Sequence, residues 1–325
     1  MEYFPVWKNP DKLAKTLTKL TRKLCKSTRL DLVTATMTAE LSDAYRTKRE
    51  GVNHILTQIE KTFPATPTRI LDVDAKLKTI QEAKSEPIKI VAANWAATGW
   101  MTSQLKKNCA AIDVGSTTTS IIPILKGTIA AEAKTDTEKL TNGELIYTGT
   151  LRTNVAATVN TIPIRNSTTR VSSELFAQSA DVHLILNNIS EKEYTVDTTD
   201  GKGKTKKDAM ARLARVVCAD TEMLSEQEIV AMAQYVYEKQ VEQIATGLRQ
   251  VRSRIEKIGA KKVAAIVTGL GRNFLASKAA LQAGFAEVVD FGELVGGDVA
   301  RVSTAFAVAL MGASWLEGRF VCWMR

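Results

Sequence analysis

Cysteine is scarce in this chain, and its few copies are scattered. Only Cys25, Cys109, Cys218 and Cys322 occur in 325 residues, and no two of them lie within a few positions of each other. This spacing argues against a zinc knuckle and against a Cys-x-x-Cys redox pair. We therefore expect reduced and mostly buried thiols, with a catalytic thiol as the lesser alternative.

Long hydrophobic runs are also lacking. The longest apolar stretch, from about residue 305 to 316, is interrupted by Gly312 and Ser314 and is shorter than the ~20 residues that a membrane-spanning helix needs. It predicts a buried helix and no membrane partner. The first eight residues, Met-Glu-Tyr-Phe-Pro-Val-Trp-Lys, lack the charged-then-apolar pattern of a signal peptide, which predicts a cytoplasmic protein.

The sequence has no repeat of basic and aromatic residues typical of single-strand binding proteins. Its net charge is +9, but between residues 239 and 256 basic side chains alternate with acidic ones, as on solvated helix faces. We therefore expect no nucleic-acid partner. The positive excess favours anionic small-molecule substrates, and the oligomeric state is not determined by these patterns.

Apolar periodicity predicts alternating strands and helices. The predicted helices are 11–25, 46–63, 98–107, 225–259, 272–283 and 298–315, and the strands are 30–36, 69–73, 88–93, 110–114, 120–125, 128–133, 262–268 and 287–290. This order indicates an α/β fold with a mixed or parallel sheet covered by helices. The length favours two lobes, which we place at 1–108 and 109–325.

A turn rich in small polar residues follows the predicted strand 110–114. Gly115 allows a tight backbone turn, and Ser116, Thr117 and Thr118 add hydroxyl donors. Successive backbone N–H groups in such a turn bind anions, and Asp113 at the strand end would suit Mg²⁺. Because another strand follows, the pattern predicts a β-hairpin with a phosphate-binding turn. The alternative is an ordinary hairpin with a polar turn.

A second glycine turn contains Gly269 and Gly271, between a strand and a helix. Phe274 stands where a dinucleotide-binding fingerprint needs its third glycine, so that fold is excluded. The two glycines still permit close approach of a ligand, and we interpret them as a further part of the phosphate site. Simple strand-to-helix packing is the alternative.

A basic loop runs from Asp200 to Lys207, and Gly203-Lys204-Thr205 resembles the end of a P-loop. A P-loop is excluded because Thr198 occupies the first glycine position and no apolar strand precedes it. Lys202 and Lys204 are predicted to form a lid over an anionic substrate, or else a plain solvated loop. Either His54 or His183 could serve as a base, but no partner is indicated for them, which favours core or surface roles for both.

Several segments together carry a resemblance that covers nearly the whole chain. They are Tyr3-Phe4-Pro5-Val6-Trp7-Lys8, Thr38-Ala39-Glu40-Leu41-Ser42-Asp43, Lys48-Arg49-Glu50-Gly51-Val52, Ala93-Asn94-Trp95, Asp113 to Thr119, Tyr147 to Thr153, Asp200-Gly201-Lys202-Gly203 and Thr268-Gly269-Leu270-Gly271. The chain resembles the hydantoinase/oxoprolinase-like synthases of methanofuran biosynthesis and related one-carbon metabolism. This resemblance implies an actin-like, sugar-kinase-like (ribonuclease H-like) fold of two lobes.

The resemblance also implies a reaction. The phenol oxygen of γ-glutamyltyramine would attack an aminomethyl-furanmethyl diphosphate, so that an aryl ether forms and diphosphate leaves. Mg²⁺ is the expected cofactor, with Asp113 as its ligand, and ATP is an alternative one. Within the matching segments, the substrate-binding residues would be Lys8, Glu40, Asp43, Lys48, Arg152, Lys202 and Lys204. The general base is not identified.

Two features depart from that family pattern. Ser120 stands where the family has aspartate, which puts a metal or polar role of this position in doubt. Only Met1 and Glu2 precede Tyr3, where relatives have an Asp-x-Gly-Gly hairpin, so we expect a first lobe without its N-terminal hairpin and weak catalysis. The rival functions are an ATP-dependent kinase or ligase and a non-catalytic nucleotide-binding assembly protein.

Overall fold

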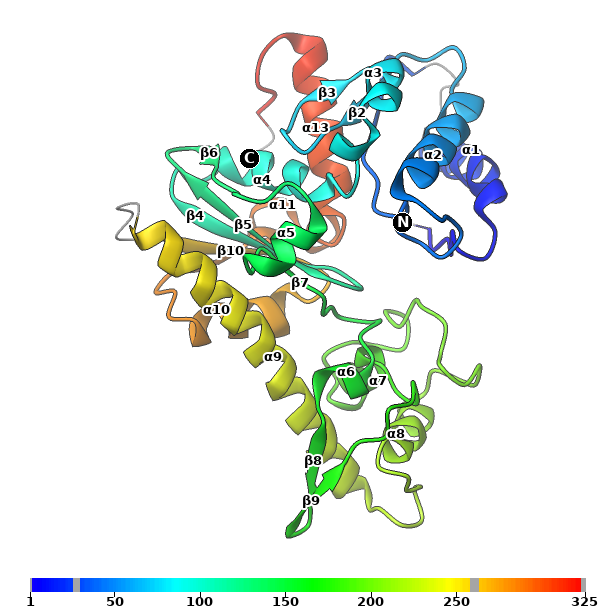
Figure 1. The fold of residues 1–325 in the computed structure, drawn as a ribbon, viewed down its shortest axis with the longest axis vertical. Coiled ribbons are helices and arrows are strands. Elements are labelled where there is room, and N and C mark those ends of the chain that lie inside the picture. Colours follow the sequence, from blue (N-terminus) through cyan, green and yellow to red (C-terminus); the bar gives the residue numbers. More distant parts are fainter. Residues whose placement is uncertain (1, 26–29, 258–262, 323–325) are drawn as a thin grey trace. The chain divides into compact units, whose positions relative to one another are not determined.

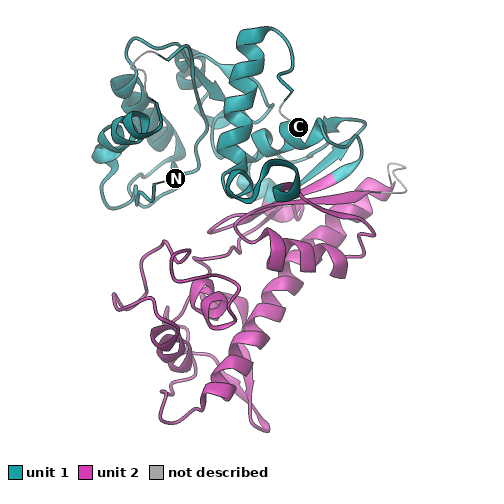
Figure 2. Cartoon of the chain, turned by 180° about the vertical axis from the view of Figure 1, so that it is seen from behind, with its two compact units in different colours: residues 1–109, 122–139, 292–325 teal, residues 110–121, 140–291 magenta. Residues whose placement is uncertain are grey.

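The computed structural model describes residues 2–25, 30–257 and 263–322. Figure 1 shows the order of its elements, and Figure 2 colours its two compact units. Unit 1 comprises residues 1–109, 122–139 and 292–325, and unit 2 comprises residues 110–121 and 140–291. The lobes predicted from the sequence were the contiguous ranges 1–108 and 109–325. The units differ from them because residues 122–139 and 292–325 return to unit 1.

Unit 1 is built from helices around a small sheet. Its main elements are α1 (Leu13–Leu24), β1 (Val33–Ala35), α2 (Lys48–Thr62), β2 (Thr68–Leu71), β3 (Leu77–Lys78), α3 (Ile80–Ser85), α4 (Asn94–Ser103) and α13 (Ser303–Glu317). Strand β1 pairs in parallel with β2, and β3 pairs antiparallel with β2. The late helix α13 packs on α4 and β1, where Gly312 leaves room for Thr34.

Helix α2 has clear local causes. The Thr47 hydroxyl caps its start by accepting a hydrogen bond from the Glu50 backbone, and the helix ends at Thr62, two residues before Pro64. Its buried face contributes Val52 and three further apolar residues to the core of unit 1, namely Ile55, Leu56 and Ile59. The sequence thus predicted this helix to within two residues at its start and one at its end.

The strand predicted at 88–93 is wrong. Residues Pro87–Lys89 form a 3-10 turn, and Ile90 and Val91 enter the core from a loop. A short apolar run is buried equally well by a strand and by a packed loop, so periodicity cannot separate the two. The helix predicted at 298–315 is also divided, into α12 (Gly297–Ala300) and α13.

A second sheet has the strand order β11-β10-β4-β5-β6, with β7 paired to β5. Its strands are β4 (Cys109–Val114), β5 (Thr119–Leu125), β6 (Thr128–Ile129), β7 (Leu145–Ile146), β10 (Ala264–Gly269) and β11 (Val288–Asp290). The predicted hairpin is confirmed as β4 and β5, whereas β6 is shorter than predicted. Strands β10 and β11 are parallel, as an α/β fold requires.

The rest of unit 2 is organised by the long helix α9 (Glu226–Lys257), which confirms the predicted helix. Its other elements are α6 (Val155–Thr158), β8 (Thr161–Ile164), β9 (Ser167–Arg170), α7 (Ser179–Ile185), α8 (Lys206–Arg215), a π-helical turn (Arg272–Ala276) and α10 (Ser277–Gln282); α5 (Asp136–Thr141) and α11 (Phe291–Val295) lie at the unit boundaries. The predicted boundaries Gly259 and Lys262 lie outside the described residues.

Within the described part of the chain, no helix is long and apolar enough to cross a membrane. Cys109 is buried, but Cys25 is half-buried and Cys218 and Cys322 are exposed, so the prediction of mostly buried thiols is wrong. The described residues also contain no group of three or more His, Cys, Asp or Glu side chains that could hold a metal ion.

Candidate functional site

The turn between β4 and β5 is closed by a hydrogen bond from the Gly115 N–H to the Thr118 carbonyl (2.9 Å). The Ser116 and Thr117 hydroxyl oxygens lie 3.3 Å apart, and the whole turn is half-buried. Among the described residues, the backbone N–H groups of Ser116, Thr117 and Thr118 donate to no protein acceptor. Three uncommitted N–H groups beside two hydroxyls form an arrangement suited to an anion.

The segment 148–153 holds this turn in place. The Thr150 N–H donates to the Gly115 carbonyl, and the Leu151 and Arg152 N–H groups both donate to the Ser116 carbonyl, each over 2.9 Å. Gly149 is pressed against the turn, because a Cβ atom there would lie 2.6 Å from the Thr117 carbonyl carbon. Sequence reasoning selected Arg152 in this segment and missed Gly149, whose signal is a glycine between two threonines.

The Gly-Leu-Gly turn lies beside the same strand. The Gly271 N–H donates to the Val114 carbonyl (3.0 Å), and Gly269 adopts a φ of +88°, which favours glycine. A Cβ atom on Gly269 would lie 2.5 Å from Asp113 Oδ1. The structure thus brings the two predicted glycine turns together, with the half-buried Asp113 carboxylate between them.

Thr150 contributes a buried hydroxyl to this region. The residue is 1% exposed, and among the described residues its Oγ1 has no hydrogen-bond partner. A Cβ atom on Gly271 would lie 2.7 Å from that oxygen. A buried polar group without a hydrogen bond lowers stability by ~1–3 kcal/mol, so the Thr150 hydroxyl destabilises unit 2.

A buried polar network supports segment 148–153 from behind. The Gln240 amide donates to Thr148 Oγ1 and to the Gly149 carbonyl, each over 2.8 Å. Its Oε1 accepts from His183 Nε2 (3.0 Å), and burial lowers the pKa of His183 to about 3. His183 is therefore a neutral core residue, which is one of the two roles that the sequence favoured, and it orients Gln240.

The basic loop after residue 197 is anchored at its base. The fully buried Arg212 donates through Nη1 to Asp200 Oδ1 (3.2 Å) and to the Gly203 carbonyl (3.0 Å). Arg215 donates to the other oxygen of Asp200 (3.0 Å). Two guanidinium groups on α8 therefore fix both ends of the segment 200–203.

The two lysines predicted on this loop have different environments. Lys202 is exposed, whereas Lys204 is half-buried with its Nζ 5.4 Å from the centre of the Tyr194 ring. Thr205 caps the start of α8 in a reciprocal pair with Asp208. The loop therefore presents one solvated charge and one charge held against an aromatic ring.

A second polar cluster lies in unit 1 around Glu40. Glu40 is 1% exposed; its Oε1 accepts from the Ala92 N–H (2.9 Å), while its Oε2 has no hydrogen-bond partner among the described residues. Burial raises the pKa of this carboxyl. Lys48 forms an ion pair with Asp136 (3.0 Å). Sequence reasoning selected Glu40 and Lys48 and missed Asp136, which is distant in the chain.

The remaining predicted residues occupy less specific positions. Lys8 and Asp43 are exposed on unit 1. Ser120 is buried and pairs with Leu145 across β5 and β7. His54 has partners that the sequence did not indicate, since its ring nitrogens contact Tyr45 and Asp11.

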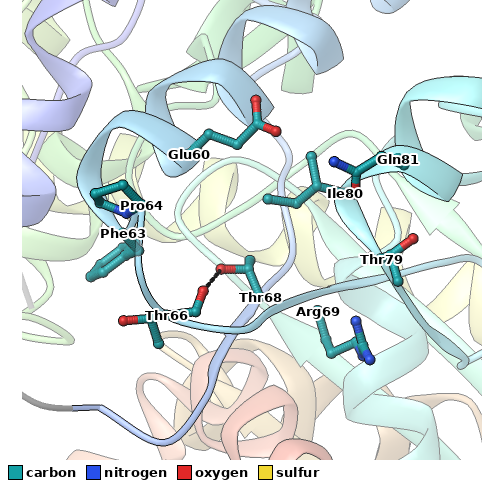
Figure 3. Close-up of a pocket in the computed structure, with 9 residues that line it drawn as sticks. All are labelled: Glu60, Phe63, Pro64, Thr66, Thr68, Arg69, Thr79, Ile80 and Gln81. Atoms are coloured by element: carbon teal, nitrogen blue, oxygen red, sulfur yellow. Dashed lines mark hydrogen bonds between the residues drawn. The ribbon is translucent and has the colours of Figure 1, made fainter.

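A surface pocket of about 430 Å³ lies in unit 1, between the end of α2 and the start of α3. Figure 3 shows its lining, which consists of Glu60, Phe63, Pro64, Thr66, Thr68, Arg69, Thr79, Ile80 and Gln81. The Arg69 guanidinium also stacks over the Trp315 ring at 4.7 Å. None of the residues that the sequence singled out lines this pocket.

The sequence model of the Hydantoinase/oxoprolinase family matches residues 31–310, and the chain belongs to this family. The chain is 40% identical over 308 residues to the (4-{4-[2-(gamma-L-glutamylamino)ethyl]phenoxymethyl}furan-2-yl)methanamine synthase of Methanocaldococcus jannaschii, covering 94% of this chain and 88% of that protein. It is 36% identical over 214 residues to the synthase of the same name from Methanococcus vannielii. This match covers 65% of this chain and 94% of that protein.

A solved structure of nucleotide-free acetone carboxylase, from a study of ATP-dependent acetone carboxylation, has a similar fold. The TM-score is 0.51 at 13% sequence identity. The match covers 94% of this chain, which spans about half (46%) of the other chain's length. This likeness concerns the fold alone and agrees with the α/β class predicted from the sequence.

Proposed function

We propose that this chain is a transferase that forms the aryl ether of (4-{4-[2-(γ-L-glutamylamino)ethyl]phenoxymethyl}furan-2-yl)methanamine in methanofuran biosynthesis. The phenol oxygen of γ-glutamyltyramine forms a bond to the furanmethyl carbon, the carbon–oxygen bond to diphosphate breaks, and the phenol proton goes to a base. The observation that carries this proposal is the 40% identity to the named synthase over nearly the whole of both chains.

The small-residue turns of unit 2 suit the leaving group. Diphosphate departure concentrates negative charge, which preorganised N–H and hydroxyl donors stabilise. The uncommitted N–H groups of Ser116, Thr117 and Thr118 and the adjacent hydroxyls supply such donors. Gly269 and Gly271 would let the backbone approach the same anion closely.

Mg²⁺ fits this proposal as a cation that arrives with diphosphate. It commonly binds through one or two carboxylates, with phosphate oxygens and water completing its shell. Asp113 is a half-buried carboxylate at a strand end next to the turn, and the described residues provide no metal site made of protein side chains alone. Asp113 would hold the ion, which would neutralise charge on the departing diphosphate.

The fold group, the substrate-binding residues and the location of the protein are part of the same proposal. We assign the α/β fold to the actin-like, sugar-kinase-like group, with unit 2 carrying its phosphate hairpin. Lys8, Glu40, Asp43 and Lys48 of unit 1, and Arg152, Lys202 and Lys204 of unit 2, are the proposed substrate-binding residues. The substrates are anionic small molecules, and the expected location is the cytoplasm.

The direct test is to incubate the purified chain with furanmethyl diphosphate, γ-glutamyltyramine and Mg²⁺, and to detect the coupled ether by mass spectrometry. We expect one diphosphate released for each ether formed, without added nucleotide. An O-methylated tyramine derivative, which has no phenol to react, is the matched negative control. Absence of ether with both substrates present would reject the transferase.

The same assay separates the rival functions when ATP is added. An ATP-dependent kinase or ligase would release ADP or AMP and would need nucleotide for every turnover. A non-catalytic assembly protein would bind nucleotide without converting it and would self-associate. Ether formation that is indifferent to ATP supports the transferase against both.

A further inference from the structure

Gln240 is an amide side chain buried in the apolar face of α9. It is 1% exposed, and every other residue that this helix buries is apolar or glycine. A buried amide lowers stability unless its hydrogen bonds are made. Its Nε2 donates to Thr148 Oγ1 and to the Gly149 carbonyl, each over 2.8 Å, and its Oε1 accepts from His183 Nε2 (3.0 Å). These three contacts, rather than packing, explain a glutamine at this position.

The partners of this amide fix its orientation. The Gly149 carbonyl only accepts hydrogen bonds, so the amide nitrogen faces Gly149 and the amide oxygen faces His183. Because an amide oxygen cannot donate, His183 Nε2 carries the hydrogen, and Nδ1 is left to accept from the Asn188 amide (3.3 Å). Burial lowers the pKa of His183 to about 3, so the ring stays neutral in this tautomer. The Phe274 ring, whose centre lies 4.8 Å from that of His183, packs against it.

The hydrogen-bond chain continues from Gln240 into segment 148–153. Thr148 Oγ1 lies 3.3 Å from Thr153 Oγ1, and the Thr153 hydroxyl donates to the Gly149 carbonyl (3.2 Å). The Gly149 N–H donates back to Thr153 Oγ1 (2.9 Å). Since Thr148 Oγ1 accepts from the Gln240 amide, its own hydrogen is available to Thr153. The backbone at Gly149 is thus held from the α9 side by one directed set of donors.

Gly149 transmits this position to the β4–β5 turn. A Cβ atom on it would lie 2.6 Å from the Thr117 carbonyl carbon and 2.8 Å from that of Ser116, so the two backbones are in direct contact. The Thr119 hydroxyl also donates to the Thr148 carbonyl (2.8 Å). Ser116 and Thr117 carry two of the turn N–H groups that donate to no acceptor among the described residues. A displacement of Gly149 would therefore move the donors that an anion uses.

We propose that Gln240 is a positioning residue of the phosphate site, which preorganises the β4–β5 turn for diphosphate, and that His183 acts through it by fixing the direction of its amide. The amide acts on the anion only through Gly149. Preorganised donors stabilise a leaving anion without reorganising during the reaction. The identity of the anion rests on the proposed function. All of the residues involved belong to unit 2.

The test compares calorimetric binding of inorganic diphosphate with Mg²⁺ in the full chain and in Gln240→Met. Methionine has nearly the length and volume of glutamine but no N–H group. The Gly149 carbonyl and Thr148 Oγ1 each keep their contact with Thr153, so the fold should survive. We expect ~10-fold weaker diphosphate binding and a kcat for ether formation that falls ~10²-fold, because small displacements of a preorganised site are costly. KM for γ-glutamyltyramine should stay unchanged.

A second variant separates positioning from stability. Gln240→Met leaves the buried His183 Nε2–H without an acceptor, which lowers the melting temperature. In the double variant Gln240→Met/His183→Leu both partners are apolar, so this loss is relieved. We expect its melting temperature to return toward wild type while diphosphate binding stays ~10-fold weaker. As a control, Gln243→Met changes a half-buried glutamine of the same helix that contacts the Thr158 carbonyl (3.4 Å), and it should bind diphosphate as the wild type does.

Two results would overturn the positioning role. One is a diphosphate affinity in Gln240→Met equal to that of the wild type. The other is an affinity that recovers together with the melting temperature in the double variant, which would indicate a structural role alone.

Diphosphate binding and ether formation together distinguish failure of this proposal from failure of the proposed function. Diphosphate binding that depends on Gln240 in a chain that forms no ether would uphold the positioning residue and reject the transferase. Ether formation with diphosphate binding that is indifferent to Gln240→Met would reject the positioning residue alone. A wild-type chain that binds no diphosphate would reject the phosphate site and, with it, the role of Gln240.

Discussion

At the scale of single residues, the glycines around the β4–β5 turn differ in what they tolerate. A Cβ atom on Gly115 would lie 3.5 Å from the Thr118 carbonyl oxygen, which is an ordinary contact. At Gly149 the same atom would collide with the backbone of Ser116 and Thr117, which cannot swing aside. Gly149 is therefore required for close packing against the turn, whereas Gly115 has room for a methyl group.

This difference predicts contrasting alanine variants. Gly149→Ala should lower the free energy of unfolding by ~1–3 kcal/mol, as overpacking does, and should weaken diphosphate binding by displacing the turn. Gly115→Ala should stay within about 0.5 kcal/mol of wild type. Thermal unfolding with and without inorganic diphosphate measures both effects. Equal stability of the two variants would contradict the close packing at Gly149.

At the scale of elements, the basic loop before α8, predicted as a lid over an anionic substrate, is anchored to the helix that follows it. Arg212 and Arg215 hold Asp200, and Arg212 also holds the Gly203 carbonyl. The loop is thus fixed by charges from the helix that follows it. Lys202 remains exposed at its tip, where it would attract an anion without a large movement.

We predict that the double variant Lys202→Ala/Lys204→Ala raises KM for the diphosphate substrate about two- to fivefold at low salt. Exposed charge interactions are worth ~0.2–1 kcal/mol each and are screened as salt rises. The melting temperature should stay near that of wild type. Lys192→Ala, an exposed lysine of the same unit, is the control. Unchanged kinetics of the double variant at low salt would leave the loop without a role in binding.

At the scale of the whole molecule, two buried groups make unfolding respond to pH in opposite senses. Burial lowers the pKa of His183 to about 3, so its contribution to stability is complete above the unfolded pKa of ~6.5 and is lost as pH falls toward 3. Burial raises the pKa of Glu40, so its contribution is complete below the usual carboxyl range and is lost as pH rises through the raised value.

His183 provides the sharper measurement, because its pKa change spans several pH units. Between pH 6.5 and 4.5, proton uptake by the unfolded chain at this residue should cost about 2 kcal/mol of unfolding free energy. Between pH 6.5 and 4.5, the His183→Gln variant should therefore lose about 2 kcal/mol less unfolding free energy than the wild type. At pH 7 the variant should be less stable than the wild type. Denaturant unfolding of both proteins at several pH values checks this difference. Parallel pH profiles would mean that His183 is protonated in the folded state.

The sequence by itself determined the local structure around the candidate sites. Helical periodicity fixed α1, α2 and α9, and a strand, a glycine-containing turn and a second strand fixed the hairpin at Gly115. These features depend on neighbouring residues, through capping, turn geometry and the side on which apolar residues recur. For the same reason, Asp113 and the two glycine turns were recognisable as a group of candidates before any fold was known.

Only the tertiary structure decided which distant segments meet. It placed segment 148–153 on the β4–β5 turn, returned α13 to unit 1, and set Tyr45 against His54. It also made a loop of residues 90–93, which the sequence presented as a strand. These contacts arise because buried surfaces must share one packed core, a condition on the whole chain that no local pattern contains.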